Sequence, residues 1–571
     1  MVKVVWQIGG AAGYGIKSTG TMLAKVASRS GYGVFGYTEY PSLIRGGHNV
    51  YQVAISNKEN GTASEFIDVL VCLDKETFYT HQNDLNKNGV VIFDPNDFEI
   101  KAERGDLRLY SVPFSELAMK SGGSKIHSNM VALGASLSLI DLDLGVLNSL
   151  LETEFKRKGK EVISINKKAA LAGFEYINKN FTLKIDHKLE KKTKKSQMYI
   201  SGNEAMALGA IAGGCRFFTA YPMTPSTAIL LYMCKKEREL GMIVKQMESE
   251  VAVINTAIGA AWAGARSFCA TSGGGFCLMT EGLGLAAMSE TPVVVANVMR
   301  PGPSTGLPTW TEQGDLNFVL NASHGEFPRF VLAPGDVKES FELTALAFNL
   351  AEKYQMPVIL LSDKYLAESY FSENKFPANF SIDRGKLLTR KELAKIENYK
   401  RYEDLEDGIS KRTIPGMKGG VHLANSDEHQ ENGFSTEDSE IRIQQMDKRF
   451  RKFENALKDV PGIKVFGEKK ADLTLVGWGS TKGVILEVLE ELKSKGRNVN
   501  FIQVISMSPF PSDEIKKMLS RSKSIYVIEN NKTGQLADLI QSNTGIKAKK
   551  ILKYDGRPFY KSEIIKHMRL L

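Results

Sequence analysis

The sequence predicts an α/β protein of several domains, and three observations support that class. The chain has 571 residues, more than one hydrophobic core accommodates, so we expect about three or four domains. Apolar residues make up 43% and charged residues 24%, which is typical of a globular protein. Continuous apolar runs alternate with helical patterns, which predicts parallel sheets covered by helices on both faces.

Residues 1–184 are the first expected domain. A segment with small residues on one side predicts a helix at 16–30. Its strands are expected at the apolar runs 2–8, 51–55, 67–73 and 90–94. The stretch 185–197 that follows is rich in lysine, and we expect it to be a basic linker.

The alternation returns in residues 198–374, the second expected domain. A run of small residues predicts a helix at 251–263. The strands of this domain are expected at 217–221, 292–298 and 357–362.

Residues 375–446 change character. They are polar, carry turn formers such as Pro415-Gly416, and show little periodicity, which predicts an extended connector or arm. Residues 447–571 alternate again and are the last expected domain. Its strands are expected at 473–480, 499–504 and 524–529, with a helix at 483–492.

The formal net charge of +9 is concentrated in two basic runs, Lys184–Lys195 and Lys547–Lys553. Neither run carries interleaved aromatic residues, so we expect a solvated linker or a face for acidic partners rather than nucleic-acid binding. No stretch approaches the roughly 20 apolar residues that span a bilayer. The N-terminus shows no leader pattern, so we expect a cytoplasmic protein that is not bound to membranes.

The cysteines argue against a disulfide framework and against a metal centre. Their number is odd and no pair is spaced C-x-x-C, so neither a zinc site nor a self-contained iron–sulfur cluster is predicted. We expect small buried thiols at Cys72, Cys215, Cys234, Cys269 and Cys277.

Two glycine-rich turns follow predicted strands. Gly9–Gly15 precedes a helix, where a phosphate-binding loop would lie, but it matches neither the dinucleotide fingerprint nor a P-loop. A tight turn and an anion site are equally plausible interpretations there. In the second turn, Gly273, Gly274 and Gly275 would let a ligand approach the backbone closely.

Three polar side chains stand where a ligand could meet them. Thr224 lies between Pro222 and Pro225, which fix the backbone and aim the hydroxyl. Arg300 ends a strand and could bind a carboxylate bidentately, although an interface salt bridge is an equal alternative. Glu250 would ordinarily be part of a solvated helix start, where the dipole favours an acid.

Three segments in this order and spacing resemble one family. Tyr221–Thr227, Gln246–Glu250 and Gly302–Thr309 resemble the thiamine-pyrimidine-binding domain in the alpha subunit of the 2-oxoacid:ferredoxin oxidoreductases. The resemblance implies oxidative decarboxylation of a 2-oxoacid, in pyruvate or 2-oxoglutarate metabolism. Coenzyme A would accept the acyl group and ferredoxin the electrons.

The rest of the chain resembles other parts of the same family. Gly9–Ile16 and Tyr40–Gly47 are similar to the gamma subunit, although Ala11-Ala12 stands where a second Gly-Gly is usual. Val476–Ser480 and Ser508–Pro511 are similar to the transketolase C-terminal-like domain. The resemblance therefore implies an alpha subunit with a gamma-type domain fused at its N-terminus.

The resemblance also implies roles for single residues. Glu250 would be the catalytic acid at N1′ of the thiamine aminopyrimidine, and Glu248 is the less favoured choice. A carboxyl works best in that role in an apolar site, which raises its pKa. Thr224 and Arg300 would contact the substrate carboxylate. The remaining cofactor contacts would be Tyr221, Pro222, Gly273 and Gly274.

Trp310 is a departure from the family pattern. Relatives often carry Lys or Arg after the Pro-Thr of this loop, and such a side chain could bind a distal carboxylate. With Trp310 as the substrate contact, we expect a weaker preference for 2-oxoglutarate and a better fit to apolar or aryl side chains.

The chain has no Gly-Asp-Gly, the usual start of the magnesium motif for thiamine diphosphate; Gly314-Asp315-Leu316 does not match it. We therefore expect a partner beta subunit that carries the diphosphate half-site, Mg²⁺ and an iron–sulfur cluster. A hetero-oligomer such as a dimer of alpha–beta pairs would follow. The alternatives are a thiamine enzyme with another acceptor, or a nucleotide-binding regulatory or assembly protein whose thiamine site is vestigial.

Overall fold

A computed structural model describes residues 3–43, 46–58, 61–182, 185, 189–190, 196–377 and 379–568. It divides into two compact units. The first unit consists of Met1–Ser201 and Glu368–Lys375, and the second consists of Gly202–Ala367 and Phe376–Leu571. Most of the predicted linker 185–197, and Ile44-Arg45 of the gamma-like segment, lie outside the described residues.

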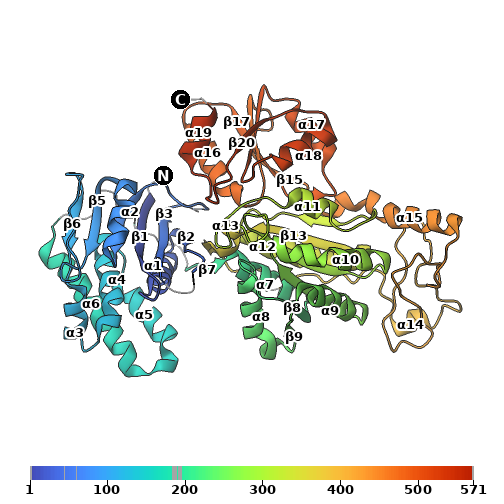
Figure 1. The fold of residues 1–571 in the computed structure, drawn as a ribbon, viewed down its shortest axis with the longest axis horizontal. Coiled ribbons are helices and arrows are strands. Elements are labelled where there is room, and N and C mark those ends of the chain that lie inside the picture. The colour runs from blue at the N-terminus through green and yellow to red at the C-terminus, as the bar shows by residue number, and fades with distance from the viewer. Residues whose placement is uncertain are drawn as a thin grey trace. The chain divides into compact units, whose positions relative to one another are not determined.

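The first unit is built on an eight-stranded sheet with the order β6-β5-β4-β1-β3-β2-β14-β7 (Figure 1). Its strands are β1 (Lys3–Ala11), β2 (Gly33–Glu39), β3 (His48–Ser56), β4 (Ile67–Cys72), β5 (Leu85–Phe93), β6 (Arg108–Ser111), β7 (Met198–Ser201) and β14 (Tyr370–Glu373). Its helices are α1 (Ile16–Arg29), α2 (Lys75–His81), α3 (Phe114–Lys120), α4 (Ser128–Leu139), α5 (Leu144–Glu154) and α6 (Lys160–Asn180).

The expected parallel pairing holds for β1, β4, β5 and β6 only. β3 runs antiparallel to both β1 and β2, and β2 was not predicted as a strand. The chain between β2 and β3 is too short for a helical crossover, so the two strands form a hairpin-like pair. Val4, Trp6 and Ile8 of β1 pack into a core with α1, α4 and α6, which explains the continuous apolar pattern.

The second unit has a seven-stranded sheet with the order β18-β12-β13-β11-β10-β8-β9. Its strands are β8 (Phe217–Ala220), β9 (Ile243–Gln246), β10 (Ser267–Thr271), β11 (Val293–Met299), β12 (Phe330–Leu332), β13 (Pro357–Asp363) and β18 (Ser506–Ser508). Its helices are α7 (Gly202–Ala212), α8 (Thr227–Leu240), α9 (Glu250–Trp262), α10 (Gly273–Met288), α11 (Leu316–Asn321), α12 (Val337–Tyr354) and α13 (Lys364–Glu368).

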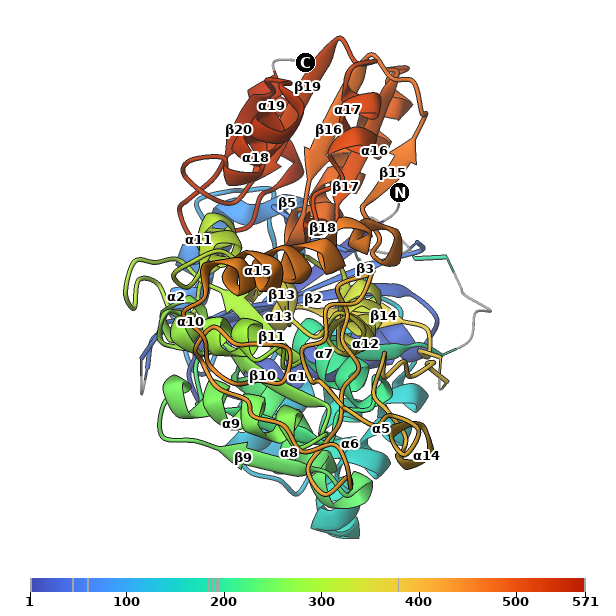
Figure 2. The same ribbon diagram turned by 90° about the vertical axis from the view of Figure 1, so that its right-hand side faces the viewer.

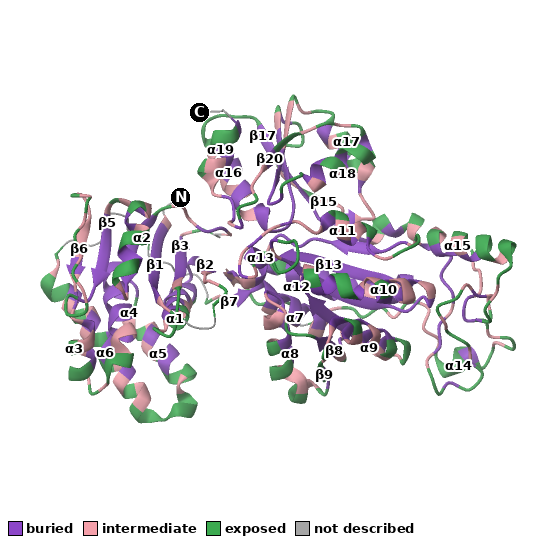
Figure 3. Ribbon diagram, viewed as in Figure 1, coloured by how far each residue is buried: buried purple, intermediate pink, exposed green. Residues whose placement is uncertain are grey.

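This sheet is covered on both faces, as the continuous apolar strands predict. Val294, Ala296 and Val298 of β11 pack into the core formed with α7, α8 and α12. Val293 and Val295 of the same strand point to the opposite core, which α9 and α10 complete. Figure 3 shows the strands buried between helices whose outer surfaces are exposed.

Two of the five cysteines are exposed, and for them the prediction of buried thiols was wrong. Cys234 and Cys277 lie on the outer sides of α8 and α10.

A five-stranded sheet with the order β15-β17-β16-β19-β20 completes the second unit. Its strands are β15 (Ile463–Gly467), β16 (Leu473–Gly477), β17 (Val499–Val504), β19 (Ser524–Glu529) and β20 (Lys549–Leu552). Its helices are α16 (Lys482–Ser494), α17 (Ser512–Leu519), α18 (Gln535–Thr544) and α19 (Lys561–Met568).

The connector between the two sheets of this unit is extended but firmly attached. Figure 2 shows it as a long loop that contains α14 (Arg390–Leu393) and leads into α15 (Ser439–Glu454). The ring of His429 stacks on Tyr402 with their centres 3.8 Å apart, and its Nε2 lies 3.0 Å from the carbonyl oxygen of Met288. His429 is therefore a packing residue of the connector within this chain.

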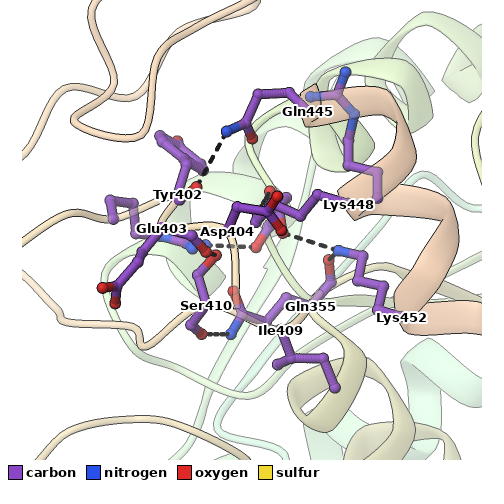
Figure 4. Close-up of polar contacts among 12 residues, drawn as sticks. Gln355, Tyr402, Glu403, Asp404, Ile409, Ser410, Gln445, Lys448 and Lys452 are labelled. Atoms are coloured by element: carbon purple, nitrogen blue, oxygen red, sulfur yellow. Dashed lines mark hydrogen bonds and ion pairs between the residues drawn. The ribbon is translucent and has the colours of Figure 1, made fainter. Parts of the chain in front are cut away.

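Buried charges attach α15 to the end of α10. Lys448 and Lys452 contact the carboxylate of Glu290 at 2.5 and 3.0 Å, and all three side chains are almost fully buried. Burial alone would raise the pKa of Glu290, but the two lysines and Arg401 outweigh it and hold that pKa well below its usual range. Figure 4 shows Lys452 reaching the carbonyl oxygen of Gln355 as well.

Candidate active site

The glycine turn at the start of α10 is the centre of the candidate site. β10 ends at Thr271, and the glycines begin the helix two residues later. A Cβ on Gly275 would overlap the side-chain oxygens of Glu250 and Thr271, and a Cβ on Gly273 would overlap the carboxylate of Asp315. The carboxyl groups of Glu250 and Asp315 therefore contact this turn at Gly275 and Gly273, where any larger residue would clash with them.

Glu250 is the first residue of α9, and its position follows from local capping. Ser249 is the N-cap, and its hydroxyl oxygen accepts a hydrogen bond from the N–H of Ala252 at 3.3 Å. The side chain of Glu250 is 3% exposed, and its Oε1 is buried without a hydrogen-bond partner among the residues the structure describes. A buried carboxyl oxygen normally has a partner, so this atom is available to a ligand. Glu248, the other candidate, is exposed.

Thr224 and Arg300 lie together. The Nη1 of Arg300 donates a hydrogen bond to the carbonyl oxygen of Thr224 at 2.7 Å. Burial lowers the pKa of Arg300, and Asp315 opposes that shift. The Nε of Arg300 is buried and has no partner within the described part of the chain. The guanidinium therefore keeps donors for a further acceptor.

Asp315 and Asn297 belong to the site but were not predicted. Asn297, near the end of β11, donates from Nδ2 to Oδ2 of Asp315 at 3.1 Å. Burial raises the pKa of Asp315 above its ordinary value, although Asn297 and Arg300 oppose the shift. Burial, helped by Asp315, also raises the pKa of Glu312 to about 7. In the sequence, Gly314-Asp315 was weighed only against a metal motif, so its closeness to the glycine turn was missed.

These contacts bring the predicted residues into one group. The hydroxyl of Thr271 lies 4.0 Å from the sulfur of Met223, which precedes Thr224. Arg300 is hydrogen-bonded to Thr224 and interacts electrostatically with Asp315. Asp315 in turn lies next to Gly273 of the glycine turn.

The other predicted cofactor residues lie at the open side of this group. Tyr221 follows β8 and is 39% exposed, and Pro222 is also exposed. A Cβ on Gly274 would have the carbonyl oxygen of Ser304 as its nearest neighbour, at 3.8 Å. The loop Pro301–Trp310 therefore approaches the glycine turn at Ser304.

Trp310 lies on the far side of that loop, against the end of the chain. The guanidinium carbon of Arg557 lies 3.4 Å from the centre of the Trp310 ring. The N–H of Thr311 donates to the carbonyl oxygen of Gly556 at 3.0 Å. The predicted substrate contact is thus in contact with a cation that the sequence gave no reason to place there.

A cavity of about 720 Å³ lies in the first unit, beside the other glycine-rich turn. Gly13, Gly15 and the first turn of α1 form one wall, and Thr38, Tyr40 and Asn49 form another. Lys25 at its edge is paired with Glu154, whereas Lys17 is exposed. Gly13 and Gly15 both have positive φ, as a tight turn requires, and the cavity beside them leaves room for a ligand.

Among the residues that the structure describes, no group of three or more His, Cys, Asp or Glu side chains could hold a metal ion. No helix there is both long enough and apolar enough to cross a membrane.

Three family models match the chain. Residues 208–448 match the thiamine diphosphate-binding model of pyruvate flavodoxin/ferredoxin oxidoreductases. Residues 5–176 match the pyruvate ferredoxin/flavodoxin oxidoreductase model. Residues 471–564 match core domain II of pyruvate:ferredoxin oxidoreductase.

Whole proteins match as well. The alpha subunit of the 2-oxoacid:ferredoxin oxidoreductase of Saccharolobus solfataricus is 34% identical, over 99% of this chain and 97% of that protein. The KorA subunit of the 2-oxoglutarate synthase of Methanocaldococcus jannaschii is 35% identical over 58% of this chain and 88% of its own length. The solved 2-oxoglutarate:ferredoxin oxidoreductase of Magnetococcus marinus, which has 2-oxoglutarate, coenzyme A and succinyl-CoA bound, is 34% identical with a TM-score of 0.94. That similarity covers 100% of this chain and 99% of that one.

These findings confirm the family predicted from the motifs and the α/β multidomain class, and they do not favour the regulatory alternative. Because the relatives are named as alpha subunits, the protein is part of a multi-subunit complex. The chain belongs to the 2-oxoacid:ferredoxin oxidoreductases, as an alpha subunit with a gamma-type domain fused at its N-terminus.

Proposed function

We propose that Glu250, Thr224 and Arg300 are this subunit's share of the active site for the thiamine-dependent decarboxylation of a 2-oxoacid. The observation that carries the proposal is the unpartnered, buried Oε1 of Glu250 beside the glycine turn. It fits the aminopyrimidine of thiamine diphosphate, which offers a ring nitrogen to a carboxyl group. When bound, that cofactor supplies the nucleophilic carbon that attacks the 2-oxo group.

Glu250 holds a proton at the ring nitrogen. Val253 and Ile254 of the same helix are fully buried, so this carboxyl lies against an apolar wall that excludes water from its contact with the ring. Gly275 lets the carboxyl approach the start of α10 without a steric clash. Tyr221, Pro222, Gly273 and Gly274 form the adjoining surface for the cofactor.

Arg300 and Thr224 bind the carboxylate of the substrate. The guanidinium is oriented by its hydrogen bond to the carbonyl oxygen of Thr224 and keeps Nε and Nη2 free for a planar, bidentate acceptor. Two adjacent polar groups on separate loops would fix the substrate for loss of carbon dioxide.

A beta subunit covers this surface and carries the diphosphate site, Mg²⁺ and an iron–sulfur cluster that passes electrons to ferredoxin. In support, two apolar side chains beside the glycine turn face solvent in this chain: Val251 is 48% exposed and Leu278 is 52% exposed. Exposed apolar groups around a partly open site are typical of a protein interface. A dimer of alpha–beta pairs is the proposed assembly.

Coenzyme A is the acyl acceptor, and the cavity of the first unit binds part of it. The start of α1 and the ammonium of Lys17 offer a positive environment for phosphate groups. Ser18, Thr21 and Asn49 add hydrogen-bonding groups to the lining. The solved relative from Magnetococcus marinus has coenzyme A bound.

The test is an assay of the chain co-expressed with its beta subunit. We expect reduction of viologen that depends on a 2-oxoacid, on coenzyme A and on thiamine diphosphate. A purified complex that contains both subunits and an iron–sulfur cluster but reduces no viologen with any 2-oxoacid would contradict the proposal.

A further inference from the structure

Three arginines gather on the last turns of α12, near the point where β10 begins. Arg266 precedes β10, and its Nη2 donates a hydrogen bond to Oδ1 of Asn349 at 2.7 Å. Arg412 of the connector donates from Nη2 to Oε1 of Glu352 at 3.0 Å. Arg384, also of the connector, forms an ion pair with Oε2 of the same carboxylate. Because Asn349 and Glu352 lie three residues apart on α12, the three guanidiniums meet one face of that helix.

Backbone contacts hold the same cluster together. The Nη2 of Arg384 also donates to the carbonyl oxygen of Gly264 at 2.9 Å, two residues before Arg266. A Cβ on Gly264 would lie 2.9 Å from Ile414, which is two residues after Arg412. The connector therefore packs directly on the turn that leads into β10.

The charges of this cluster do not balance. Among the residues that the structure describes, Glu352 is the one carboxylate in an ion pair with these guanidiniums, and it serves two of them. Arg266 contacts only the neutral amide of Asn349 and the ring of Phe348, whose centre lies 5.5 Å from the guanidinium carbon. Asp383 acts on Arg266 electrostatically, but it is exposed to solvent. Three cations thus share one buried carboxylate.

Two of the arginines have hydrogen-bond donors that are not used. Arg266 is 4% exposed and Arg412 is 3% exposed. The Nε and Nη1 of each are buried without a hydrogen-bond partner within the described part of the chain. Burial lowers the pKa of Arg266 to about 10, which still leaves the guanidinium charged at neutral pH. Buried charged donors without a partner are unfavourable, so these nitrogens require an acceptor from outside the chain.

We propose that Arg266, Arg384 and Arg412 enclose a small monovalent inorganic anion, of which chloride is the simplest example. Such an anion accepts charge-assisted hydrogen bonds from guanidinium N–H groups and offsets the excess positive charge around Glu352. It has to be small, because the unused donors are buried.

This anion site is separate from the candidate active site. Arg266 stands before the first residue of β10, whereas the glycine turn follows the last residue of that strand. The two sites therefore lie at opposite ends of one strand, and the anion site does not depend on the proposed function.

The anion links the connector to the sheet. Arg384 and Arg412 belong to the connector and Arg266 to the start of β10, so a shared acceptor adds bonds between segments that are distant in the sequence. A ligand that binds only the folded state stabilises it in proportion to the logarithm of its concentration once the site is nearly saturated.

The first test follows the melting temperature of the full-length chain while sodium gluconate is replaced by sodium chloride at constant ionic strength. Gluconate is a large organic anion that an enclosed site excludes, so chloride should raise the melting temperature of the wild type by about 2–4 °C. Arg266→Gln removes two of the unused donors and should abolish this response. Arg390→Gln, at an exposed position on α14 of the same connector, is the matched control and should respond as the wild type does.

Bromide provides a second test that needs no variant. Crystals of the wild-type chain grown in sodium bromide should show an anomalous-scattering peak within hydrogen-bonding distance of the unused nitrogens of Arg266 and Arg412. Bromide replaces chloride in this experiment because the two ions have the same charge and similar size.

A wild-type melting temperature that does not respond to chloride would overturn the anion site. An equal response in the wild type and in Arg266→Gln would overturn it too, since the effect would then arise elsewhere. If Arg266→Gln does not fold, the crystals decide: a peak at the cluster supports the site, and its absence refutes it.

Discussion

Gln313 and Asn530 exchange two hydrogen bonds across the two sheets of the second unit. The N–H of Gln313 donates to the carbonyl oxygen of Asn530 at 2.6 Å, and the N–H of Asn530 donates to Oε1 of Gln313 at 3.0 Å. The Nε2 of Gln313 also donates to the carbonyl oxygen of Trp478 at 2.9 Å. One fully buried side chain therefore connects the end of the loop 301–310 to two strand ends of the C-terminal sheet.

The substitution Gln313→Leu should destabilise the protein by about 1–3 kcal/mol, because it leaves the buried backbone N–H of Asn530 without the acceptor that Gln313 supplies. Equilibrium unfolding in urea measures this free energy. Gln444→Leu, at an exposed position on α15, is the control and should change it by less than about 0.5 kcal/mol. Equal stability of the two variants would show that Gln313 does not hold the sheets together.

Breaking the buried charge cluster should release the connector. Glu290→Gln leaves Lys448 and Lys452 buried without a counter-charge, and we expect a loss of about 3–5 kcal/mol in unfolding free energy. Limited proteolysis should then cleave between residues 375 and 438 faster than in the wild type. Glu281→Gln, exposed on α10, which ends two residues before Glu290, should have neither effect; unchanged proteolysis of Glu290→Gln would refute the anchoring role.

Alanine substitutions at two neighbouring glycines of the turn should have different effects on the stability of the protein. In Gly275→Ala the new Cβ overlaps Glu250 and Thr271, so we expect a loss of about 1–3 kcal/mol from overpacking. Gly274→Ala meets nothing closer than 3.8 Å and should be neutral or slightly stabilising, since alanine favours the helix. Thermal unfolding of the isolated subunit checks both, and similar melting temperatures would contradict the geometry.

Stability should depend on the ionisation of Glu312. The pKa of this group is raised from 4.5 to about 7 in the folded protein, so the folded state binds its proton more tightly than the unfolded state does. The stability it contributes is therefore full at low pH and is lost as the pH rises from about 4.5 through about 7. Glu312→Gln should lose that pH dependence. Melting temperatures of both proteins between pH 5 and pH 8 provide the comparison, and parallel curves would contradict the shift.

The sequence predicted those parts of the fold that depend on local patterns. The apolar runs of β11 and β13 and the small-residue helix α9 lie where expected, since burial on both faces leaves a continuous signal. The pairing of β2 with β3, and the inclusion of β7 and β14 in the first sheet, were missed because they depend on contacts between distant segments.

The same division holds for the site. Glu250, Thr224 and Arg300 could be proposed from the sequence, because each lies in a short segment with its own signature. Asp315, Gln313 and Arg557 could not, since their importance comes from what they contact. Arg557 in particular contacts Trp310 across a separation of more than 200 residues, and no local pattern reveals such a contact.

The central claim is the role of Glu250, and one comparison tests it most directly. Glu250→Gln and Glu248→Gln remove the same charge two residues apart, but only Glu250 is buried at the glycine turn. In the complex with the beta subunit, we expect Glu250→Gln to lower kcat for 2-oxoacid-dependent viologen reduction by about a hundredfold or more, while Glu248→Gln stays within about threefold. If both variants retain wild-type kcat, or if Glu248→Gln is the more damaged, the assignment of Glu250 is wrong.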